Sequence, residues 1–220
     1  MFVILLGLPG AGKGTQAAYV SQKTGLAHIT TGELFRDNVR RGTDLGVKAK
    51  PYVESGKLVP DELTIGMLLE RISSPDCSRG FLLDGFPRNL EQARALDDAL
   101  ARRGATPGRV LYIKVSTDEL IARLSGRWNC PQCAAVYHER NLPPRRGGVC
   151  DKCGGRLQQR EDDRPDVVRT RLEVNLAQME GLIDYYRQQG KLVEIDGEGE
   201  VEAVGRSMLA ALGVSEEARL

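Results

Sequence analysis

Two features are missing from these 220 residues: a long hydrophobic run and a signal-like N-terminus. No stretch approaches the roughly 20 apolar residues that a membrane-spanning helix needs, which argues against an integral membrane protein. The N-terminal apolar run is short and has no basic segment before it, unlike a secretory signal peptide. We therefore expect a cytoplasmic protein without a membrane partner.

The chain also lacks an excess of charge of either sign. Lys and Arg number 31 against 30 Asp and Glu, which leaves a formal charge of +1. Such a balance is a poor match for proteins that coat nucleic acid or anionic membranes. The hydrophobic fraction of 41% is ordinary for a globular protein, and the length suffices for one substantial core with small insertions.

Cysteine is scarce, and an odd total of five without a secretion signal argues against a disulfide framework. Cys130 and Cys133 form one C-x-x-C pair, Cys150 and Cys153 form another, and sixteen residues separate the pairs. This spacing is typical of a structural zinc site, in which four thiolates close a tetrahedral shell. Reduced cysteines without a metal are the alternative, and iron is compatible with the same ligands. Cys77 is expected to be a bystander.

The N-terminus carries the most informative stretch. Phe2–Leu6 is a short apolar run typical of a buried strand in a parallel sheet. Gly7 to Lys13 follow as G-x-x-x-x-G-K, and a helix-forming run comes next. In such a loop, backbone N–H groups, a lysine and a helix N-terminus converge on phosphate oxygens. A glycine-rich turn without a ligand is the alternative, but the strand before it and the helix after it favour phosphate binding.

The remaining pattern alternates strands with helices, which predicts an α/β fold with about five parallel strands. A helical stretch near 31–60 separates two strands, has Thr31 as its expected N-cap and is too long for a routine connection. The long helix after Pro165 is expected to bury one apolar face: Val168, Leu172, Leu176, Met179 and Ile183. The expected strands are 2–6, 26–30, 81–83, 110–115 and 191–195, and the expected helices are 15–23, 31–40, 45–54, 62–72, 90–103, 118–126, 165–189 and 201–212.

A second candidate site follows the strand 81–83. Asp84 comes at the carboxyl end of that strand, where parallel sheets bind ligands. There Asp84 can lie near a phosphate-bound Mg²⁺ and Arg88 can clamp phosphate oxygens. A Gly/Pro turn with a surface arginine is the alternative. Arg123 and Arg127, one helical turn apart, are open to the same two interpretations, ligand contact or solvated charge.

Six stretches of the sequence, which are given at the end of this paragraph, resemble adenylate kinase and occur in that family's order. The resemblance is specifically to the long-lid bacterial form with a zinc knuckle. Together they span nearly the whole chain, and the G-K-G-T ending of the first accounts for Thr15 standing one place late. Asn89 departs from the threonine that is common after G-F-P-R in this family. The stretches are GLPGAGKGT (7–15), TTGELFR (30–36), GKLVPDE (56–62), FLLDGFPRNLEQ (81–92), GRWNCPQC (126–133) and QREDDRPDVVRTRL (159–172).

The resemblance implies a P-loop nucleoside monophosphate kinase fold. Its core would comprise 1–29, 60–125 and 164–220, with an NMP-binding insertion at 30–59 and a zinc-bearing lid at 126–163. The implied reaction is reversible transfer of the terminal phosphoryl group of ATP to AMP, which gives two ADP. Mg²⁺ with ATP and a structural Zn²⁺ are the implied cofactors; ATP, AMP and ADP are the implied partners of a monomer.

The resemblance also implies roles for individual residues. The ATP site would comprise Gly10, Ala11, Gly12, Lys13, Gly14, Thr15, Arg123, Arg127, Val136, Tyr137 and Gly199. The AMP site would comprise Thr31, Gly32, Arg36, Lys57, Leu58, Val59, Gly85, Phe86, Pro87, Arg88, Gln92, Arg160 and Arg171, with Gln92 reading the adenine edge. The catalytic cations would be Lys13, Arg88, Arg123, Arg127, Arg160 and Arg171, because phosphoryl transfer needs positioning and charge neutralisation.

Three other functions remain open at this point. A kinase for UMP or CMP shares the loop and the G-F-P-R turn, but the zinc knuckle and Gln92 favour AMP. A nucleic-acid-binding zinc ribbon could use the basic residues of the knuckle, although the knuckle has few aromatic residues to stack on bases. A nucleotide-dependent switch without transfer activity would leave Arg36 and Arg88 without a role.

Overall fold

The computed structural model describes residues 1–54, 59–133, 135–159, 163 and 165–214, without the side chains of 165, 166 and 171. The chain divides into two compact units. The first comprises Met1–Gly7, Gly12–Lys114 and Gln178–Leu220, and the second comprises Leu8–Ala11 and Val115–Ala177. The glycine-rich loop near the N-terminus therefore has residues in both units.

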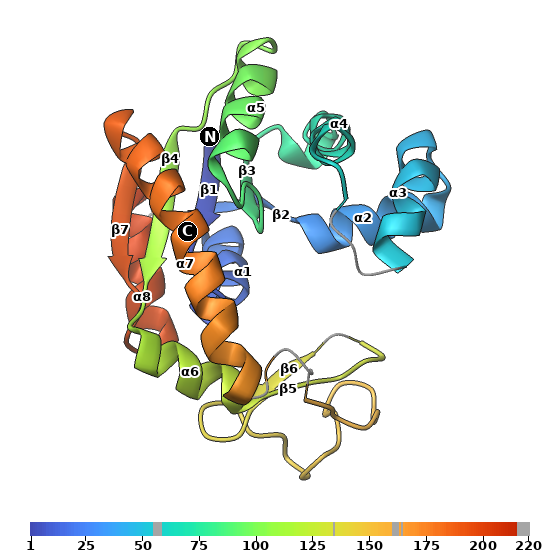
Figure 1. The fold of residues 1–220 in the computed structure, drawn as a ribbon, viewed down its shortest axis with the longest axis vertical. Coiled ribbons are helices and arrows are strands. Elements are labelled where there is room, and N and C mark those ends of the chain that lie inside the picture. The colour runs from blue at the N-terminus through green and yellow to red at the C-terminus, as the bar shows by residue number, and fades with distance from the viewer. Residues whose placement is uncertain (55–58, 134, 160–162, 164, 215–220) are drawn as a thin grey trace. The chain divides into compact units, whose positions relative to one another are not determined.

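The first unit is built on a parallel sheet with the strand order β2–β3–β1–β4–β7 (Figure 1). Val3, Leu82 and Leu111 in its inner strands are fully buried, as expected where helices cover both faces of a parallel sheet. The predicted α/β class and the five parallel strands are confirmed. The strands are β1 (Phe2–Leu6), β2 (Ala27–Thr30), β3 (Phe81–Asp84), β4 (Arg109–Lys114) and β7 (Leu192–Asp196).

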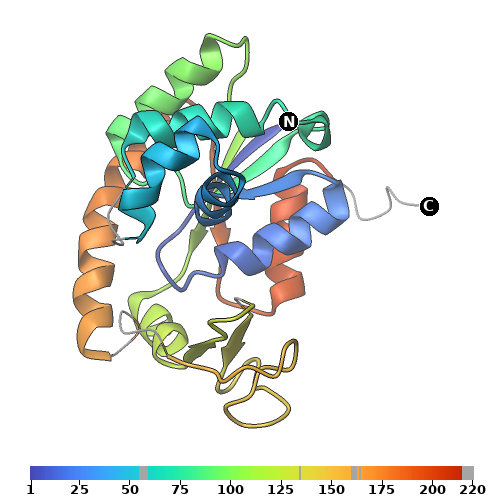
Figure 2. The ribbon, with the colours of Figure 1, turned by 90° about the vertical axis from the view of Figure 1, so that its right-hand side faces the viewer.

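The helices of this unit flank the sheet and extend from one side of it. Helices α1 and α8 pack side by side (Figure 2), where the Gln16 side-chain amide donates a 3.0 Å hydrogen bond to the Val201 carbonyl. Helices α2, α3 and α4 pack on one another and include the helical excursion predicted between β2 and β3. The helices are α1 (Lys13–Thr24), α2 (Thr31–Arg41), α3 (Asp44–Glu54), α4 (Asp61–Arg71), α5 (Leu90–Ala101) and α8 (Val201–Ala211), and a 3₁₀ turn spans Pro75–Cys77.

The sheet register brings three connecting segments to one edge. Asp84 at the end of β3 pairs with Leu5 of β1 on one side and with Thr30 of β2 on the other. Because parallel strands point the same way, the segments that follow these strands leave from the same edge of the sheet. The first turn of α2 therefore lies beside the turn at residues 85–88, and the glycine-rich loop begins at that same edge.

The second unit contains α6 (Thr117–Ser125), a short hairpin and the first half of α7 (Pro165–Gln188). The hairpin pairs β5 (Arg127–Asn129) with β6 (Val136–His138) in antiparallel register, and the sequence did not predict it. A small apolar cluster lies against it and contains Cys130, Ala135, Tyr137, Cys150 and Leu157, with Trp128 packed at its side. The knuckle thus has a modest apolar core of its own.

The N-cap of α2 was predicted one residue too late. Thr30, not Thr31, caps this helix, since its hydroxyl accepts a 3.1 Å hydrogen bond from the Glu33 backbone N–H. Thr30 and Glu33 stand three residues apart, which is the spacing of a capping box. Thr31 is instead the first helical residue, and its side chain is buried.

The buried face of α7 also differs from the prediction. Val168, Leu172 and Met179 are buried as expected, but Leu176 is 39% exposed. The buried positions further along are Leu182 and Tyr186, whose side chains are fully covered. The predicted positions advance by four, four, three and four residues, slightly more per turn than the helical period of 3.6, so the predicted face drifts from the buried one along this 24-residue helix.

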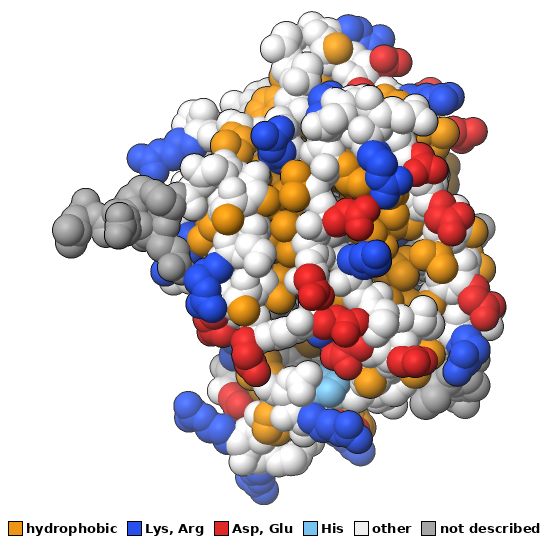
Figure 3. All heavy atoms as spheres, turned by 90° about the vertical axis from the view of Figure 1, so that its left-hand side faces the viewer, with side chains coloured by type: hydrophobic (Ala, Val, Ile, Leu, Met, Phe, Trp, Pro, Cys, Tyr) orange, Lys and Arg blue, Asp and Glu red, His pale blue; other side chains and the backbone are white. Residues whose placement is uncertain are grey.

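Charges of both signs are interspersed among hydrophobic side chains on the face shown in Figure 3. Several charged side chains of the first unit form ion pairs, as where the Arg187 guanidinium lies 2.6 Å from Asp184 and 2.8 Å from Glu194. This mixture agrees with the near-neutral composition. Among the helices that the structure describes, none combines the length and apolar character that crossing a membrane requires.

Candidate functional site

The glycine-rich loop turns the chain from β1 into α1. Gly10 and Gly12 have φ angles of +86° and +87°, a region that favours glycine. A Cβ at Gly10 would also lie only 2.9 Å from Cγ of Leu124. Gly12 is the N-cap and α1 begins at Lys13, so the first N–H groups of the helix, which lack intrahelical acceptors, follow the loop directly. This is the local arrangement that binds phosphate.

One lysine and one carboxylate lie at the start of α1. Nζ of Lys13 donates a 2.7 Å hydrogen bond to the Gly7 carbonyl. A Cβ on Gly14 would lie 3.8 Å from Oδ2 of Asp84, which shows how close that carboxylate is to the helix N-terminus. His28 Nε2 lies 3.7 Å from the same oxygen. A hard carboxylate oxygen beside a phosphate site suits Mg²⁺, which is usually bound by one or two carboxylates together with substrate phosphates.

The turn after β3 is joined to the start of α2. The Thr31 hydroxyl lies 3.5 Å from the Gly85 carbonyl, and a Cβ on Gly85 would lie 3.0 Å from that hydroxyl. Gly85 has a φ of +90°, so glycine is favoured there on both counts. The Arg88 Nε–H donates a 2.9 Å hydrogen bond to the same carbonyl. The sequence placed Thr31, Gly85 and Arg88 in one site, and the structure brings them together.

A second arginine approaches the same helix turn. Nη1 of Arg36 would lie 3.2 Å from a Cβ on Gly32, so the guanidinium folds back over the first turn of α2. Arg36 and Arg88 are both exposed, whereas Phe86, Pro87 and Val59 are buried and support the backbone around them. Lys57 and Leu58, also predicted for this site, lie outside the described residues.

Gln92 connects the turn to the start of α4. Its side-chain carbonyl accepts a 2.7 Å hydrogen bond from the Arg88 backbone N–H, and its side-chain NH₂ donates a 2.7 Å hydrogen bond to Oδ1 of Asp61. Its own backbone N–H donates to the Asn89 side chain, which caps α5. Asn89, the departure from the family pattern, therefore still acts as a helix cap. Asp61 was not singled out from the sequence.

The arginines of the second unit are held by carboxylates. The Arg123 Nε–H donates to Glu119 at 2.7 Å, one helical turn away. Arg127 makes a two-pronged contact with Asp163, whose side chain is fully buried, through hydrogen bonds of 2.8 and 2.5 Å. The sequence did not reveal Asp163 as the partner, since 36 residues separate the two. Arg160 and the side chain of Arg171 lie outside the described part of the chain.

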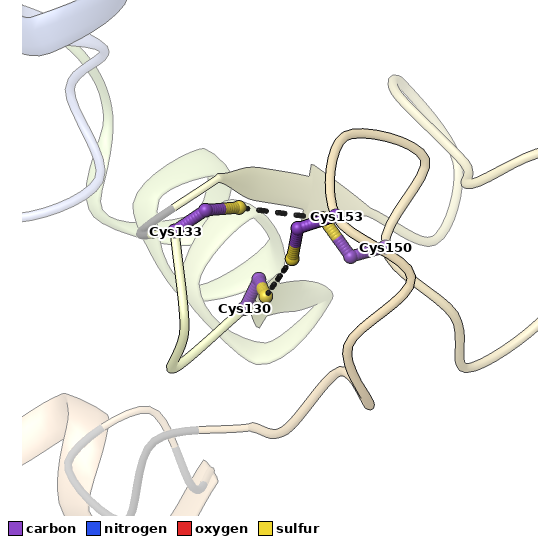
Figure 4. Close-up of side chains that lie close together, drawn as sticks. All are labelled: Cys130, Cys133, Cys150 and Cys153. Carbon is purple, nitrogen blue, oxygen red and sulfur yellow. Dashed lines mark hydrogen bonds between the residues drawn. The ribbon is translucent and has the colours of Figure 1, made fainter.

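The four predicted metal ligands converge in the knuckle (Figure 4). Their sulfur atoms all lie within 4.8 Å of one another, with 3.4 Å between Cys130 and Cys153 and 3.5 Å between Cys133 and Cys150. A tetrahedral site with Zn–S bonds of about 2.3 Å requires sulfur atoms about 3.8 Å apart, so the cluster fits zinc with a small adjustment. Closed four-thiolate sites are structural, since no ligand position is left for a substrate.

The thiols of this cluster differ in acidity for identifiable reasons. The Tyr137 hydroxyl lies 3.5 Å from Cys150 Sγ and lowers the pKa of Cys150 to about 6. The Gly155 backbone N–H favours the Cys153 thiolate, but the thiols of Cys130 and Cys133 outweigh it and raise the pKa of Cys153 to about 12. Close thiols cannot all ionise without an opposing charge. A divalent cation supplies that charge and binds the thiolates.

Three residues predicted to contact the ATP base have different surroundings. Val136 is 50% exposed, whereas Tyr137 is 6% exposed, and its hydroxyl accepts a 2.7 Å hydrogen bond from the Asp151 backbone N–H. The Tyr137 side chain therefore stabilises the knuckle, and of this pair Val136 presents the exposed side chain. Gly199 is exposed in the turn between β7 and α8.

Comparison with known proteins covers nearly the whole chain. A sequence profile described as adenylate kinase matches residues 5–191. The chain belongs to the adenylate kinase family. It is 50% identical over 212 residues to the adenylate kinase of Lysinibacillus sphaericus (strain C3-41), which covers 96% of this chain and 98% of that protein.

Two other relatives agree. The adenylate kinase of Brevibacillus brevis (strain 47) is 52% identical over 204 residues, or 93% of this chain and 95% of that protein. The adenylate kinase of Caldicellulosiruptor bescii is 49% identical over 214 residues, or 97% of this chain and 100% of that protein. The likeness therefore includes the knuckle as well as the sheet, and it confirms the family that the sequence motifs predicted.

Proposed function

We propose that this member of the adenylate kinase family transfers the terminal phosphoryl group of ATP to AMP, reversibly, to give two ADP. The observation that carries the proposal is identity of about half to several adenylate kinases over nearly the full chain. Two separate sets of residues suited to phosphate binding support it. One surrounds the N-terminus of α1, and the other lies at the turn after β3.

The donor half would use the loop before α1. Backbone N–H groups from Gly10 to Thr15 would bind ATP phosphates, and Lys13 would leave the Gly7 carbonyl to accompany the transferred group. A charge-assisted hydrogen bond to a phosphate oxygen is stronger than the hydrogen bond to the neutral Gly7 carbonyl, which favours this exchange. Mg²⁺ bound near Asp84 would neutralise charge on the phosphates, which is the chemistry that a metal supplies in this class of reaction.

The acceptor half would use the turn after β3 and the start of α2. Arg36 and Arg88 are exposed cations at one site, as two-pronged recognition of a phosphate requires. Thr31 and Gln92 would contact the rest of AMP. Lys57, Leu58 and Val59 would complete the AMP site, and Arg160 and Arg171 would act on the transferring group.

The remaining assignments extend this proposal to the domains. Residues 30–59 would form the AMP-binding insertion and residues 126–163 a lid, with 1–29, 60–125 and 164–220 as the core. A lid excludes water, so that ATP donates to AMP and is not hydrolysed. Zinc held by the four cysteines would keep the lid rigid. We further propose a cytoplasmic monomer.

The test is a panel of acceptors. The purified protein is incubated with Mg·ATP and, separately, AMP, CMP, UMP or GMP, and each diphosphate is quantified. We expect rapid ADP formation with AMP and at most slow transfer to the other three. Rapid transfer to CMP or UMP would keep the chemistry and overturn the acceptor. ATP binding without transfer to any acceptor would leave a nucleotide-dependent switch.

A further inference from the structure

The side-chain amide of Gln92 is held in one orientation by two different partners. Oε1 accepts from the Arg88 backbone N–H at 2.7 Å, and Nε2 donates to Oδ1 of Asp61 at 2.7 Å. A backbone N–H can only donate, and a carboxylate oxygen can only accept. Rotation of the amide by half a turn would set donor against donor at Arg88 and acceptor against acceptor at Asp61. The two contacts therefore fix which end of Gln92 is the donor.

Asp61 and Gln92 each lie in the first turn of a helix. Asp61 is the first residue of α4, which begins after Pro60 with a 3.1 Å hydrogen bond from the Thr64 N–H to the Pro60 carbonyl. Gln92 lies in the first turn of α5, where its backbone N–H donates a 2.8 Å hydrogen bond to Oδ1 of Asn89. Gln92 is also 9% exposed, so water does not replace a lost partner easily. The pair thus has little freedom to rearrange.

Each amide atom keeps capacity for one more hydrogen bond. Oε1 has a second lone pair and Nε2 has a second hydrogen. An adenine edge offers a donating amine beside an accepting ring nitrogen, which matches this fixed polarity. A hypoxanthine or guanine edge offers an accepting carbonyl beside a donating ring N–H, which is the reverse. Purines with a 6-oxo group would therefore meet two repulsive contacts in place of two hydrogen bonds.

We propose that Asp61 is a specificity-positioning residue, which fixes the amide of Gln92 so that the acceptor site selects 6-amino over 6-oxo purine monophosphates. This inference rests on the proposed function, because it takes Gln92 as the residue that reads the acceptor base. Asp61 acts through Gln92 and need not touch the nucleotide. The 6-oxo purines are rejected because their polar groups are mispaired with the Gln92 amide. Mispaired hydrogen-bonding groups discriminate between ligands more strongly than the presence or absence of one methylene does.

Asp61→Asn is the variant that tests this role. An asparagine at 61 can present either an acceptor or a donor to Gln92, so it satisfies both orientations of the glutamine amide. Of the two described partners of the amide, the Arg88 N–H alone then opposes rotation. We expect the ratio of kcat/KM for AMP to that for inosine monophosphate to fall about tenfold, the effect of removing one of two opposing polar contacts.

Glu62→Gln is the matched control. Glu62 is exposed, is the next residue in the first turn of α4, and its substitution removes the same unit of charge from the helix N-terminus. We expect this variant to keep the wild-type ratio. Asp61→Ala is a second variant: it removes the acceptor without offering a donor, so position 61 again favours neither orientation and the ratio should fall as it does in Asp61→Asn. A ratio of two acceptors is independent of the fraction of folded enzyme.

The outcomes separate the inference from the function on which it rests. A lower AMP-to-inosine ratio in Asp61→Asn but not in Glu62→Gln supports the role of Asp61, and calorimetric binding of the two monophosphates should shift in the same direction. Equal losses with both acceptors, with the ratio unchanged, would make Asp61 merely structural and overturn the inference while the kinase remains. Absence of AMP phosphorylation by the wild-type protein would overturn the proposed function and this inference together.

Discussion

Individual side chains in this protein are fixed by partners that the sequence pattern does not reveal. Arg127 is a clear candidate cation from its place after a strand and helix, but its carboxylate partner is 36 residues away. Gln92 and Asp61 are 31 residues apart and meet only because two helix starts lie together. Candidate residues could be predicted because the chemistry of phosphate demands certain residue types. Their partners could not be predicted, because which residues meet depends on how the fold brings distant parts of the chain together.

The pair of Arg127 and Asp163 gives a prediction at this scale. Asp163 is fully buried while Arg127 keeps a 21% exposed side chain, so removing the carboxylate strands a partly buried cation. We expect Asp163→Ala to reduce the free energy of unfolding by about 3 kcal/mol, measured by chemical denaturation. Glu119→Ala removes a carboxylate partner of Arg123, but that carboxylate is 38% exposed and its loss should cost about 0.5 kcal/mol or less. Equal effects of the two variants would contradict a special role for the buried pair.

At the scale of elements, strands with long apolar runs and helices with clear caps could be predicted from the sequence. Gly25 ends α1 in a left-handed conformation, with φ +72°, as its position after Thr24 indicates. The hairpin of β5 and β6 could not be predicted, because strands of three residues carry too little sequence pattern to be recognised. Leu176 shows a different error: helix α7 was predicted correctly, but one residue of its predicted buried face is exposed.

The zinc knuckle gives the prediction at this scale. Cys130→Ser, or removal of the metal by a chelator, should lower the melting temperature of the protein and loosen the second unit, with a modest loss of activity while the chain stays folded. Acidification should have the same effect, because protons compete with the metal for the thiolates. Metal content, melting temperature and activity are measured together.

The control for the knuckle is the fifth cysteine. Cys77 is buried in the first unit, where Arg71 donates a 3.1 Å hydrogen bond to its sulfur, and it takes no part in the cluster. Cys77→Ser should therefore keep one bound metal per chain. Complete loss of activity in Cys130→Ser with an unchanged melting temperature would show that the metal is not structural.

At the scale of the whole molecule, the order of motifs along the chain is more informative than any one of them. A glycine-rich loop alone is compatible with many nucleotide-binding proteins, and a pair of C-x-x-C sequences alone with many zinc ribbons. Their combination with the turn at 85–88 predicted the family, and identity over nearly the full length confirmed it. The fold followed because alternating strand and helix patterns leave few topologies open.

The measurement that tests the central claim most directly starts from ADP. The purified protein is given Mg·ADP alone, and all adenine nucleotides and inorganic phosphate are followed by phosphorus NMR, with Lys13→Ala as the inactive control. Transfer between two nucleotides predicts that ATP and AMP appear in equal amounts, without inorganic phosphate, until equilibrium is reached. Release of inorganic phosphate with AMP, or no change in ADP, would contradict the assignment of this chain as an enzyme that transfers a phosphoryl group between adenine nucleotides.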